Sequence, residues 1–185
     1  GSEIKKTLNF DSIIEMNVKG SSWGMACNSI HFIDLFSYLV NSSELKSSKT
    51  NLSKKLYISK RGNKFNEVSG QMIFKINNHL LSIICDDSKE RSLSMDIYNE
   101  KIKHSVDFKK KKWESNMNGL LKIQNCHIEG VSEMSGKIVD NLIKDDQCGL
   151  ISYEESCKLH LTLLTQFRMH FSKILKREII ECTIT

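Results

Sequence analysis

The central part of the chain has the hydrophobic pattern of a β-sheet. Between residues 54 and 108, hydrophobic and polar residues alternate in several short runs, and turn-forming residues separate these runs. A period of two is typical of strands with one buried face, and short connections are typical of antiparallel neighbours. The pattern predicts strands at 13–19, 54–59, 68–76, 80–86, 93–97 and 102–108. Residues 120–129 form either one more short strand or a loop, and the polar stretch 42–53 is predicted to be a loop.

The spacing of hydrophobic residues changes to that of helices in three places. From Cys27 to Val40 they recur every three or four positions, and Asn28 is suitably placed to cap the first turn, although the helix could also start a few residues earlier. A second helix is expected from Ser132 to the "CG" at 148–149. The third follows "SYEE" at 152–155, which has the form of a capping box. This order of elements predicts an α+β fold, in which a mostly antiparallel open sheet has helices packed on one face.

The chain is expected to form one domain that associates with further copies of itself. Its 185 residues, 39% of them hydrophobic, are enough for one core. Gly1 and Ser2 resemble a vector-derived scar, so the domain is expected to span residues 3–185. We expect two or three helices to leave part of the alternating strands uncovered, so that a homo-oligomer forms through the other sheet face. The residues that motivate this expectation are Met72, Phe74, Ile76, Met95 and Ile97.

Composition excludes several classes of function. The net charge of +5 is mild, and no basic stripe with interleaved aromatic residues is visible, so no nucleic-acid partner is expected. No apolar run approaches the roughly 20 residues that span a bilayer, and no leader is visible, so no membrane partner is expected. The six cysteines have no C-x-x-C spacing, which argues against a zinc or thioredoxin motif. Reduced thiols and this composition predict a cytoplasmic protein.

The segment "GSSWGMACNSIHFIDLFSYLV" (20–40) holds the candidate chemistry. On a helix, Cys27 and His31 are four residues apart and share a face, Asn28 is three residues before His31, and Asp34 is three residues after it. From the residues alone, His31 is equally well a core or capping histidine and the working group of a site. A Cys27–His31 nucleophile pair is a further alternative, because a helix N-terminus lowers the pKa of a thiol.

The same segment resembles the opening of the C-terminal domain of the Gfo/Idh/MocA oxidoreductases. In that family a glycine-rich turn leads into a helix with Asp-x-x-x-His-x-x-Asp. His31 and Asp34 match its last two positions, whereas Cys27 stands where the family has the first Asp. Residues 132–164 resemble the closing pair of helices. The tail "CTIT" resembles that of members acting on nucleotide sugars and surface polysaccharides.

The resemblance implies that this chain is the substrate-binding and dimerisation half of an NAD(P)-dependent sugar or nucleotide-sugar dehydrogenase. The N-terminal Rossmann domain of that family is absent from it. We therefore expect no cofactor in this chain, NAD or NADP in the full-length protein, and no activity from the isolated chain. The resemblance implies that His31 is the catalytic, proton-transferring residue and that Asp34 orients it. Trp23, Cys27 and Asn28 would bind the substrate, although Trp23 could equally fill a domain interface.

Two other functions remain open at this stage. Cys27 in place of the family's Asp favours a non-catalytic interaction module that associates through its sheet and has a degenerate site. A Cys27-dependent hydrolase or transferase is the third possibility. No metal site is expected in any of these hypotheses.

Overall fold

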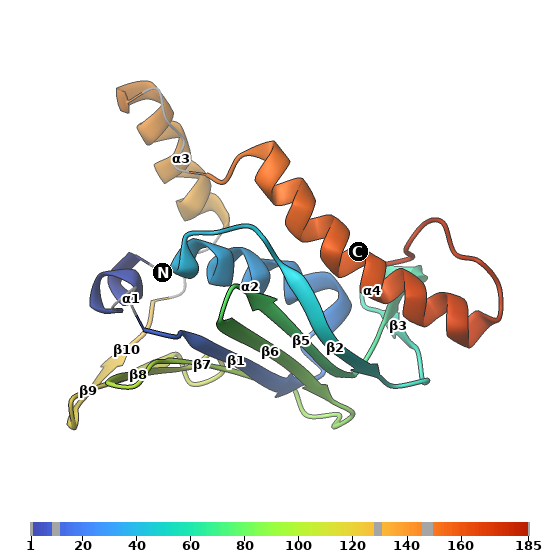
Figure 1. Cartoon of the computed structure of the whole chain (residues 1–185), viewed down its shortest axis with the longest axis horizontal. Coiled ribbons are helices and arrows are strands. Elements are labelled where there is room, and N and C mark those ends of the chain that lie inside the picture. The colour runs from blue at the N-terminus through green and yellow to red at the C-terminus, as the bar shows by residue number, and fades with distance from the viewer. Residues whose placement is uncertain (1, 9–11, 128–130, 146–149, 185) are drawn as a thin grey trace.

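The computed structural model describes residues 2–8, 12–127, 131–145 and 150–184, and its main element is an eight-stranded sheet (Figure 1). The strand order is β10-β9-β8-β7-β1-β6-β5-β2. The strands are β1 (Glu15–Ser21), β2 (Lys46–Leu52), β5 (Gly70–Ile76), β6 (His79–Asp86), β7 (Ser92–Tyr98), β8 (Ile102–Asp107), β9 (Lys112–Met117) and β10 (Leu120–Asn125). All neighbouring strands are antiparallel except β1 and β6, which are parallel. The predicted α+β class and mostly antiparallel open sheet are therefore confirmed.

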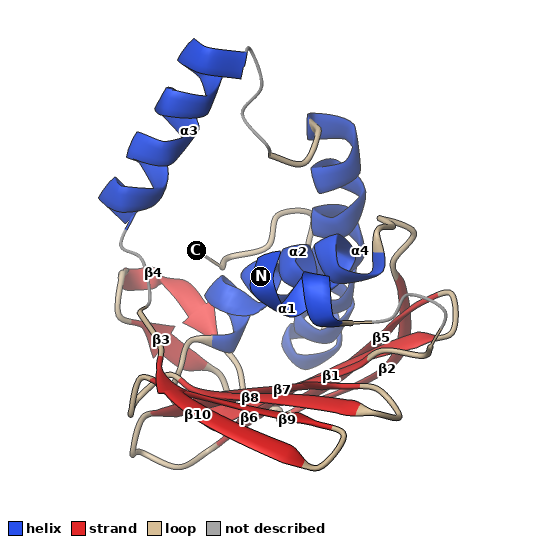
Figure 2. Cartoon of the chain, turned by 90° about the vertical axis from the view of Figure 1, so that its left-hand side faces the viewer, coloured by secondary structure: helices blue, strands red, loops and turns tan. Residues whose placement is uncertain are grey.

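All four helices of the described residues lie on the same side of the sheet (Figure 2). They are α1 (Ser2–Thr7), α2 (Met25–Val40), α3 (Val131–Asp145) and α4 (Tyr153–Leu175). Helix α2 follows β1 and packs against β6 and α4, whereas α3 stands away from the sheet. None of the described helices has the length and hydrophobicity needed to cross a membrane.

The core lies between the sheet and the helices α2 and α4. Ile33 and Phe36 of α2 and Phe167 and Phe171 of α4 are almost completely buried. They face the strand residues of one alternating set, which are buried on the same side: Met16, Val18, Met72, Phe74, Ile76, Leu81, Ile83, Met95 and Ile97. Because apolar burial is the main stabilising contribution to folding, this layer holds the fold together.

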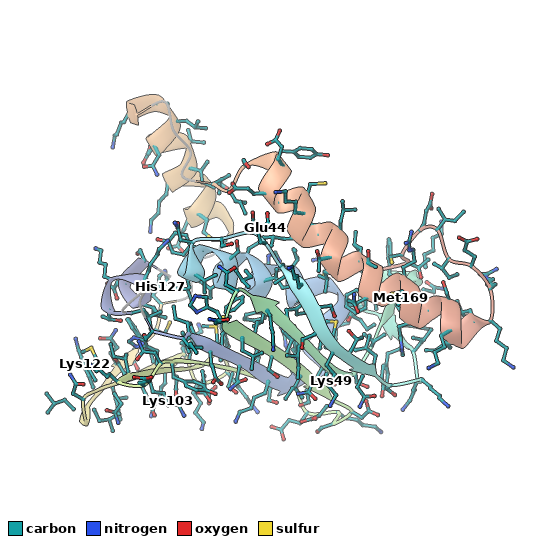
Figure 3. All side chains as sticks on the ribbon, in the orientation of Figure 1. Glu44, Lys49, Lys103, Lys122, His127 and Met169 are labelled. Atoms are coloured by element: carbon teal, nitrogen blue, oxygen red, sulfur yellow. The ribbon has the colours of Figure 1, made fainter. Side chains whose placement is uncertain are left out.

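The apolar residues that we expected to need a partner are covered by this chain's own helices. Met72, Phe74, Ile76, Met95 and Ile97 are at most 5% exposed, so the expected surplus of apolar sheet area was wrong. The open face instead carries polar groups. There the Tyr98 hydroxyl donates to Glu15 at 2.7 Å and accepts from the Asn17 amide at 3.0 Å. Lys49 on β2 and Lys103 on β8 also belong to the open face (Figure 3).

The pattern did not predict α1, β2, β9 or the strand β4 (Gly62–Glu67). The prediction of a loop at 42–53 was wrong because β2 lies within it. Strand β2 is the edge of the sheet and pairs only with β5. An edge strand can keep polar residues on most positions, since little of it is buried, and its sequence then loses the period of two. Strand β4 pairs with β3 (Tyr57–Ser59) in a hairpin outside the large sheet.

The ends of the two core helices differ in how well they were predicted. The N-cap of α2 is Gly24, with φ at 79°, so the prediction of Asn28 as the cap was wrong. The capping box of α4 is confirmed, because Ser152 Oγ accepts from the Glu155 backbone N–H at 3.2 Å and the Glu155 carboxylate accepts from the Ser152 N–H. The predicted helix end at 148–149 lies outside the described residues.

The C-terminal residues extend along the β3–β4 hairpin without forming a strand in the described part. The Asn66 backbone N–H donates to the Thr183 carbonyl at 2.7 Å, and its side-chain amide donates to the Thr183 hydroxyl at 2.8 Å. These two hydrogen bonds fix the hairpin from its outer side.

Candidate functional site

The candidate site lies at the edge of the sheet where the parallel strands β1 and β6 end. Ser21 and Asp86 are paired at the carboxyl ends of these strands, and three residues separate the end of β1 from the start of α2. In α/β structures, ligands bind outside the carboxyl ends of parallel strands, where a helix N-terminus also points outward. Gly24 allows the sharp entry into α2, since it has a positive φ and a Cβ there would come 2.8 Å from the Asn28 amide nitrogen.

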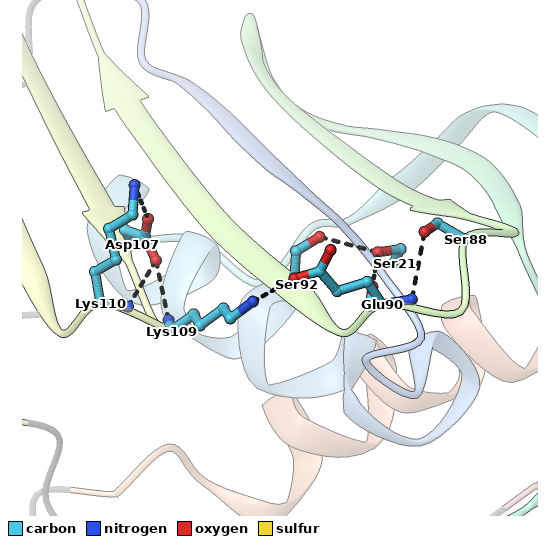
Figure 4. Close-up of polar contacts among 7 residues, drawn as sticks. All are labelled: Ser21, Ser88, Glu90, Ser92, Asp107, Lys109 and Lys110. Carbon is cyan, nitrogen blue, oxygen red and sulfur yellow. Dashed lines mark hydrogen bonds and ion pairs between the residues drawn. The ribbon is translucent and has the colours of Figure 1, made fainter.

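Neighbouring loops brace this edge (Figure 4). The Ser21 hydroxyl bonds to the Glu90 carbonyl and lies 3.0 Å from the Ser92 hydroxyl. Lys109 pairs with Glu90, and Asp107 accepts from the backbone N–H groups of the Lys109–Lys110 turn. Part of the lysine run at 109–112 thus serves a local turn.

A cavity of about 380 Å³, which we name the α2 pocket, opens at this edge. The start of α2 forms one wall, and the β3–β4 hairpin with the residues after it forms the other. The α2 wall includes Trp23, Cys27 and Asn28, and the hairpin wall includes Tyr57, Glu67 and Ser69. The structure therefore brings the three predicted substrate-binding residues to one pocket.

Glu67 joins the two walls. Its Oε2 accepts a hydrogen bond from the Ala26 backbone N–H at 2.8 Å, which caps α2 in place of a side chain at Gly24. Burial raises the pKa of Glu67, although hydrogen bonds from the backbone of Ala26 and Cys27 and the charge of Arg61 oppose the rise. Sequence reasoning missed this residue, since nothing local in "FNEVSG" indicates that its carboxylate binds the backbone of Ala26, 41 positions earlier in the chain.

Asn28 and Trp23 are held mainly by the protein itself. The Asn28 amide nitrogen donates to the Trp23 and Gly24 carbonyls at 2.8 and 3.0 Å, which leaves its side-chain oxygen as an acceptor. Trp23 is only 2% exposed, its indole N–H donates to the Ile84 carbonyl, and its ring meets Phe32 edge to face. Trp23 is therefore mainly a core residue that borders the pocket.

His31 and Asp34 are outside the pocket lining. His31 is exposed on α2, which excludes a buried core histidine. Asp34 is half-buried, and burial raises its pKa, while the charges of His160 and His31 lower it. Asp34 thus interacts electrostatically with both histidines, but it makes no hydrogen bond to His31. Its Oδ1 has no hydrogen-bond partner in the described residues. No hydrogen bond joins Cys27 to His31 either, so the thiol nucleophile lacks a base in this arrangement.

At this edge the Glu67 carboxylate takes the place that an anion would occupy at the N-terminus of α2. A dinucleotide would place its pyrophosphate on the helix N-terminus after β1, but the Glu67 carboxylate already occupies the Ala26 N–H there. Within the described ranges, no three His, Cys, Asp or Glu side chains come together as metal ligands.

No family model and no curated protein matches the sequence. Solved structures do match. The dehydrogenase MviM from Clostridium difficile has a TM-score of 0.61 at 16% identity over 89% of this chain and 56% of its own. UDP-N-acetylglucosamine 3-dehydrogenase GnnA from Acidithiobacillus ferrooxidans has a TM-score of 0.56 at 11% identity over 84% of this chain and 52% of its own. A mutant of KijD10, a 3-ketoreductase from Actinomadura kijaniata in complex with TDP-benzene and NADP, has a TM-score of 0.50 at 5% identity over 83% and 51%.

These matches define the fold of the chain. It is the fold of the C-terminal domain of Gfo/Idh/MocA-type oxidoreductases, and the chain spans about half the length of the solved structures it matches. The resemblance noted in the segment around His31 is thus confirmed at the level of structure.

Proposed function

We propose that this chain is the substrate-binding half of a sugar or nucleotide-sugar oxidoreductase, and that the sugar binds in the α2 pocket. One observation carries the proposal: a pocket at the carboxyl ends of the parallel strands is lined by the predicted residues Trp23, Cys27 and Asn28. The matched structures include a UDP-N-acetylglucosamine dehydrogenase and a ketoreductase crystallised with a TDP derivative, which supports this class of substrate.

The polar groups of the pocket suit a polyhydroxylated ligand. The Glu67 carboxylate and the Asn28 side-chain oxygen are acceptors, and each can take a hydrogen bond from a sugar hydroxyl. Pockets that combine a largely apolar lining with a few placed polar groups are typical small-molecule sites.

In this proposal His31 transfers the proton of the reacting hydroxyl. It is on the same helix as the pocket residue Cys27, one turn further along, and its ring is open to solvent. An imidazole can act as a general acid or base toward a hydroxyl group of the substrate. In this proposal a separate N-terminal domain binds the nicotinamide cofactor.

Self-association through the open sheet face is also part of the proposal. No described element covers this face, and Ile73, Leu80 and Ile84 are only partly buried on it. A specific dimer would bury more than about 1,000 Å² in total. Sedimentation velocity at micromolar concentration should give a dimer, and a monomer would remove this part.

The competing function is an interaction module with a degenerate site. Two observations favour it: position 27 is a cysteine, and His31 does not line the pocket. The two functions differ in ligand binding. In ¹H–¹⁵N spectra of the chain titrated with UDP-N-acetylglucosamine to millimolar concentration, an oxidoreductase half should show saturable shifts at residues 22–28 and 67–69. Shifts absent from both segments would favour the interaction module.

A further inference from the structure

The α2 pocket contains two buried hydroxyl groups without hydrogen-bond partners. In the described residues, only three buried side-chain oxygen or nitrogen atoms lack a partner, namely Asp34 Oδ1, Tyr57 OH and Ser69 Oγ. The last two line the pocket. Buried polar groups are almost always hydrogen-bonded, because leaving one unpaired forfeits its hydration without compensation. Two such groups in one pocket indicate that a ligand is their partner.

We propose that Tyr57 and Ser69 form a subsite that binds a hydroxyl group of the substrate. Tyr57 is on β3, and Ser69 follows β4 two residues after Glu67. Both belong to the hairpin wall, opposite the predicted residues on α2. The inference rests on the proposed function, because it names which wall recognises the sugar and which chemical group is recognised there.

The nearby Asp87 carboxylate determines the kind of group that fits. The Ser69 and Tyr57 hydroxyls lower the pKa of Asp87 by acting as hydrogen-bond donors toward its carboxylate, and the charge of Lys55 adds to this effect. Neither hydroxyl, however, meets a described residue at the distance and angle of a regular hydrogen bond. An alcohol can accept from the two hydroxyls and donate to the carboxylate at the same time. An ionised phosphate or carboxylate cannot donate to Asp87, so the subsite favours a neutral hydroxyl, while an anionic group of the ligand would be bound by Lys60, Arg61 or Arg91, which also line the pocket.

The hairpin holds this subsite in place before a ligand arrives. Thr183 fixes Asn66 on its outer side with two hydrogen bonds, and the adjacent Glu67 is tied to the first turn of α2. Tyr57 is paired with Glu67 across the hairpin. A site that is ordered in the free protein binds with a smaller entropic cost, which makes these hydroxyls useful specificity groups.

Tyr57→Phe and Ser69→Ala test the assignment, with Tyr153→Phe as the matched control because Tyr153 is exposed on α4. Since neither hydroxyl is hydrogen-bonded in the free chain, both variants should unfold at the wild-type temperature or slightly above it. Phe also keeps the ring contact with the Lys55 ammonium group. Each variant should weaken binding of UDP-N-acetylglucosamine and of N-acetylglucosamine roughly 2- to 10-fold, whereas the control should bind like wild type.

The outcomes separate the inference from the proposed function. If wild type binds and Tyr57→Phe and Ser69→Ala bind equally well, the subsite is overturned and the α2 pocket stands. If UDP alone binds wild type as tightly as UDP-N-acetylglucosamine does, and its affinity falls by the same factor in both variants, then the two hydroxyls contact the phosphates. That result would overturn the assignment to a sugar hydroxyl. If the wild-type chain binds neither sugar probe, the proposed function falls and the subsite falls with it. A clear loss of thermal stability in Tyr57→Phe would show that its hydroxyl is bonded within the protein and would contradict the premise.

Discussion

Helices α2 and α3 have almost the same length, 16 and 15 residues, and each has an apolar face, but only α2 is packed into the core. Eight residues of α2 are buried, among them Phe32, Ile33 and Phe36. On α3, Met134, Val139 and Leu142 are each about half exposed. A helical period therefore tells which residues share a face, whereas only the topology tells whether anything in the chain covers that face.

The largest expected difference between α2 and α3 is in how much a truncated apolar side chain lowers the free energy of unfolding. Phe36→Ala removes a fully buried ring and should lower the free energy of unfolding by about 3–5 kcal/mol. Leu142→Ala on α3 should change it by about 0.5 kcal/mol or less, because the side chain already contacts water. Urea unfolding of both variants measures the difference. Similar losses would mean that α3 is packed in solution, which would abolish the contrast.

Replacing the exposed His31 on α2 should lower the turnover of the full-length oxidoreductase that the proposal predicts. His31→Asn should reduce turnover roughly 10²- to 10⁴-fold, the usual range for a lost general acid or base, with substrate affinity little changed. Cys27→Ser is the matched variant one turn away and should cost far less. Equally severe losses in both would favour the thiol–imidazole alternative instead.

A buried histidine under α1 should make stability depend on pH. His104 is 1% exposed, and its Nε2 is 2.8 Å from Thr7 Oγ1. The Thr7 hydroxyl donates to Ile4, so Nε2 donates to Thr7, while Nδ1 accepts from the Trp113 indole N–H. If Nδ1 were protonated, its N–H would point at the Trp113 indole N–H, and that hydrogen bond would be lost. Burial also lowers the pKa of His104, because it disfavours the charged form.

Because the folded-state pKa of His104 is depressed, the unfolded chain takes up its proton first. The contribution of His104 to stability should be complete above about pH 6.5 and be lost as the pH falls, by at most about 1.4 kcal/mol per pH unit. Imidazole proton shifts from NMR give the folded-state pKa of His104 directly. A folded-state pKa of His104 at or above the ordinary histidine value of about 6.5 would contradict this assignment.

Loss of the Glu67 cap should have a smaller effect. Glu67→Ala removes the acceptor for the Ala26 N–H and should cost about 1 kcal/mol of stability. Glu67→Gln keeps an acceptor oxygen and should cost less. Glu44→Ala, which removes an exposed partner of Lys158, serves as the control and should remain within about 0.5 kcal/mol. If the control loses as much as Glu67→Ala, the cap has no special role.

The periodic parts of the fold could be predicted from the sequence, whereas the hairpin wall of the α2 pocket could not. The capping box at Ser152 and the helix from Cys27 to Val40 follow from local spacing, which is why they were found. Tyr57, Glu67 and Ser69 meet α2 only after a hairpin outside the main sheet has folded back. No local pattern encodes that contact, and the polar β2 likewise lacks the alternation that marks a strand.

The accessibility of Cys27 tests the central claim most directly, because its thiol lines the α2 pocket and the exposure of Cys126 and Cys157 outside it is also intermediate. The rate of iodoacetamide alkylation at each cysteine can be followed by peptide mass spectrometry, with and without saturating UDP-N-acetylglucosamine. If the sugar binds in the α2 pocket, Cys27 should be alkylated several-fold more slowly with the ligand while Cys126 and Cys157 are unaffected. Equal rates at Cys27 with and without the ligand, or equal slowing at all three cysteines, would contradict a sugar site at the start of α2.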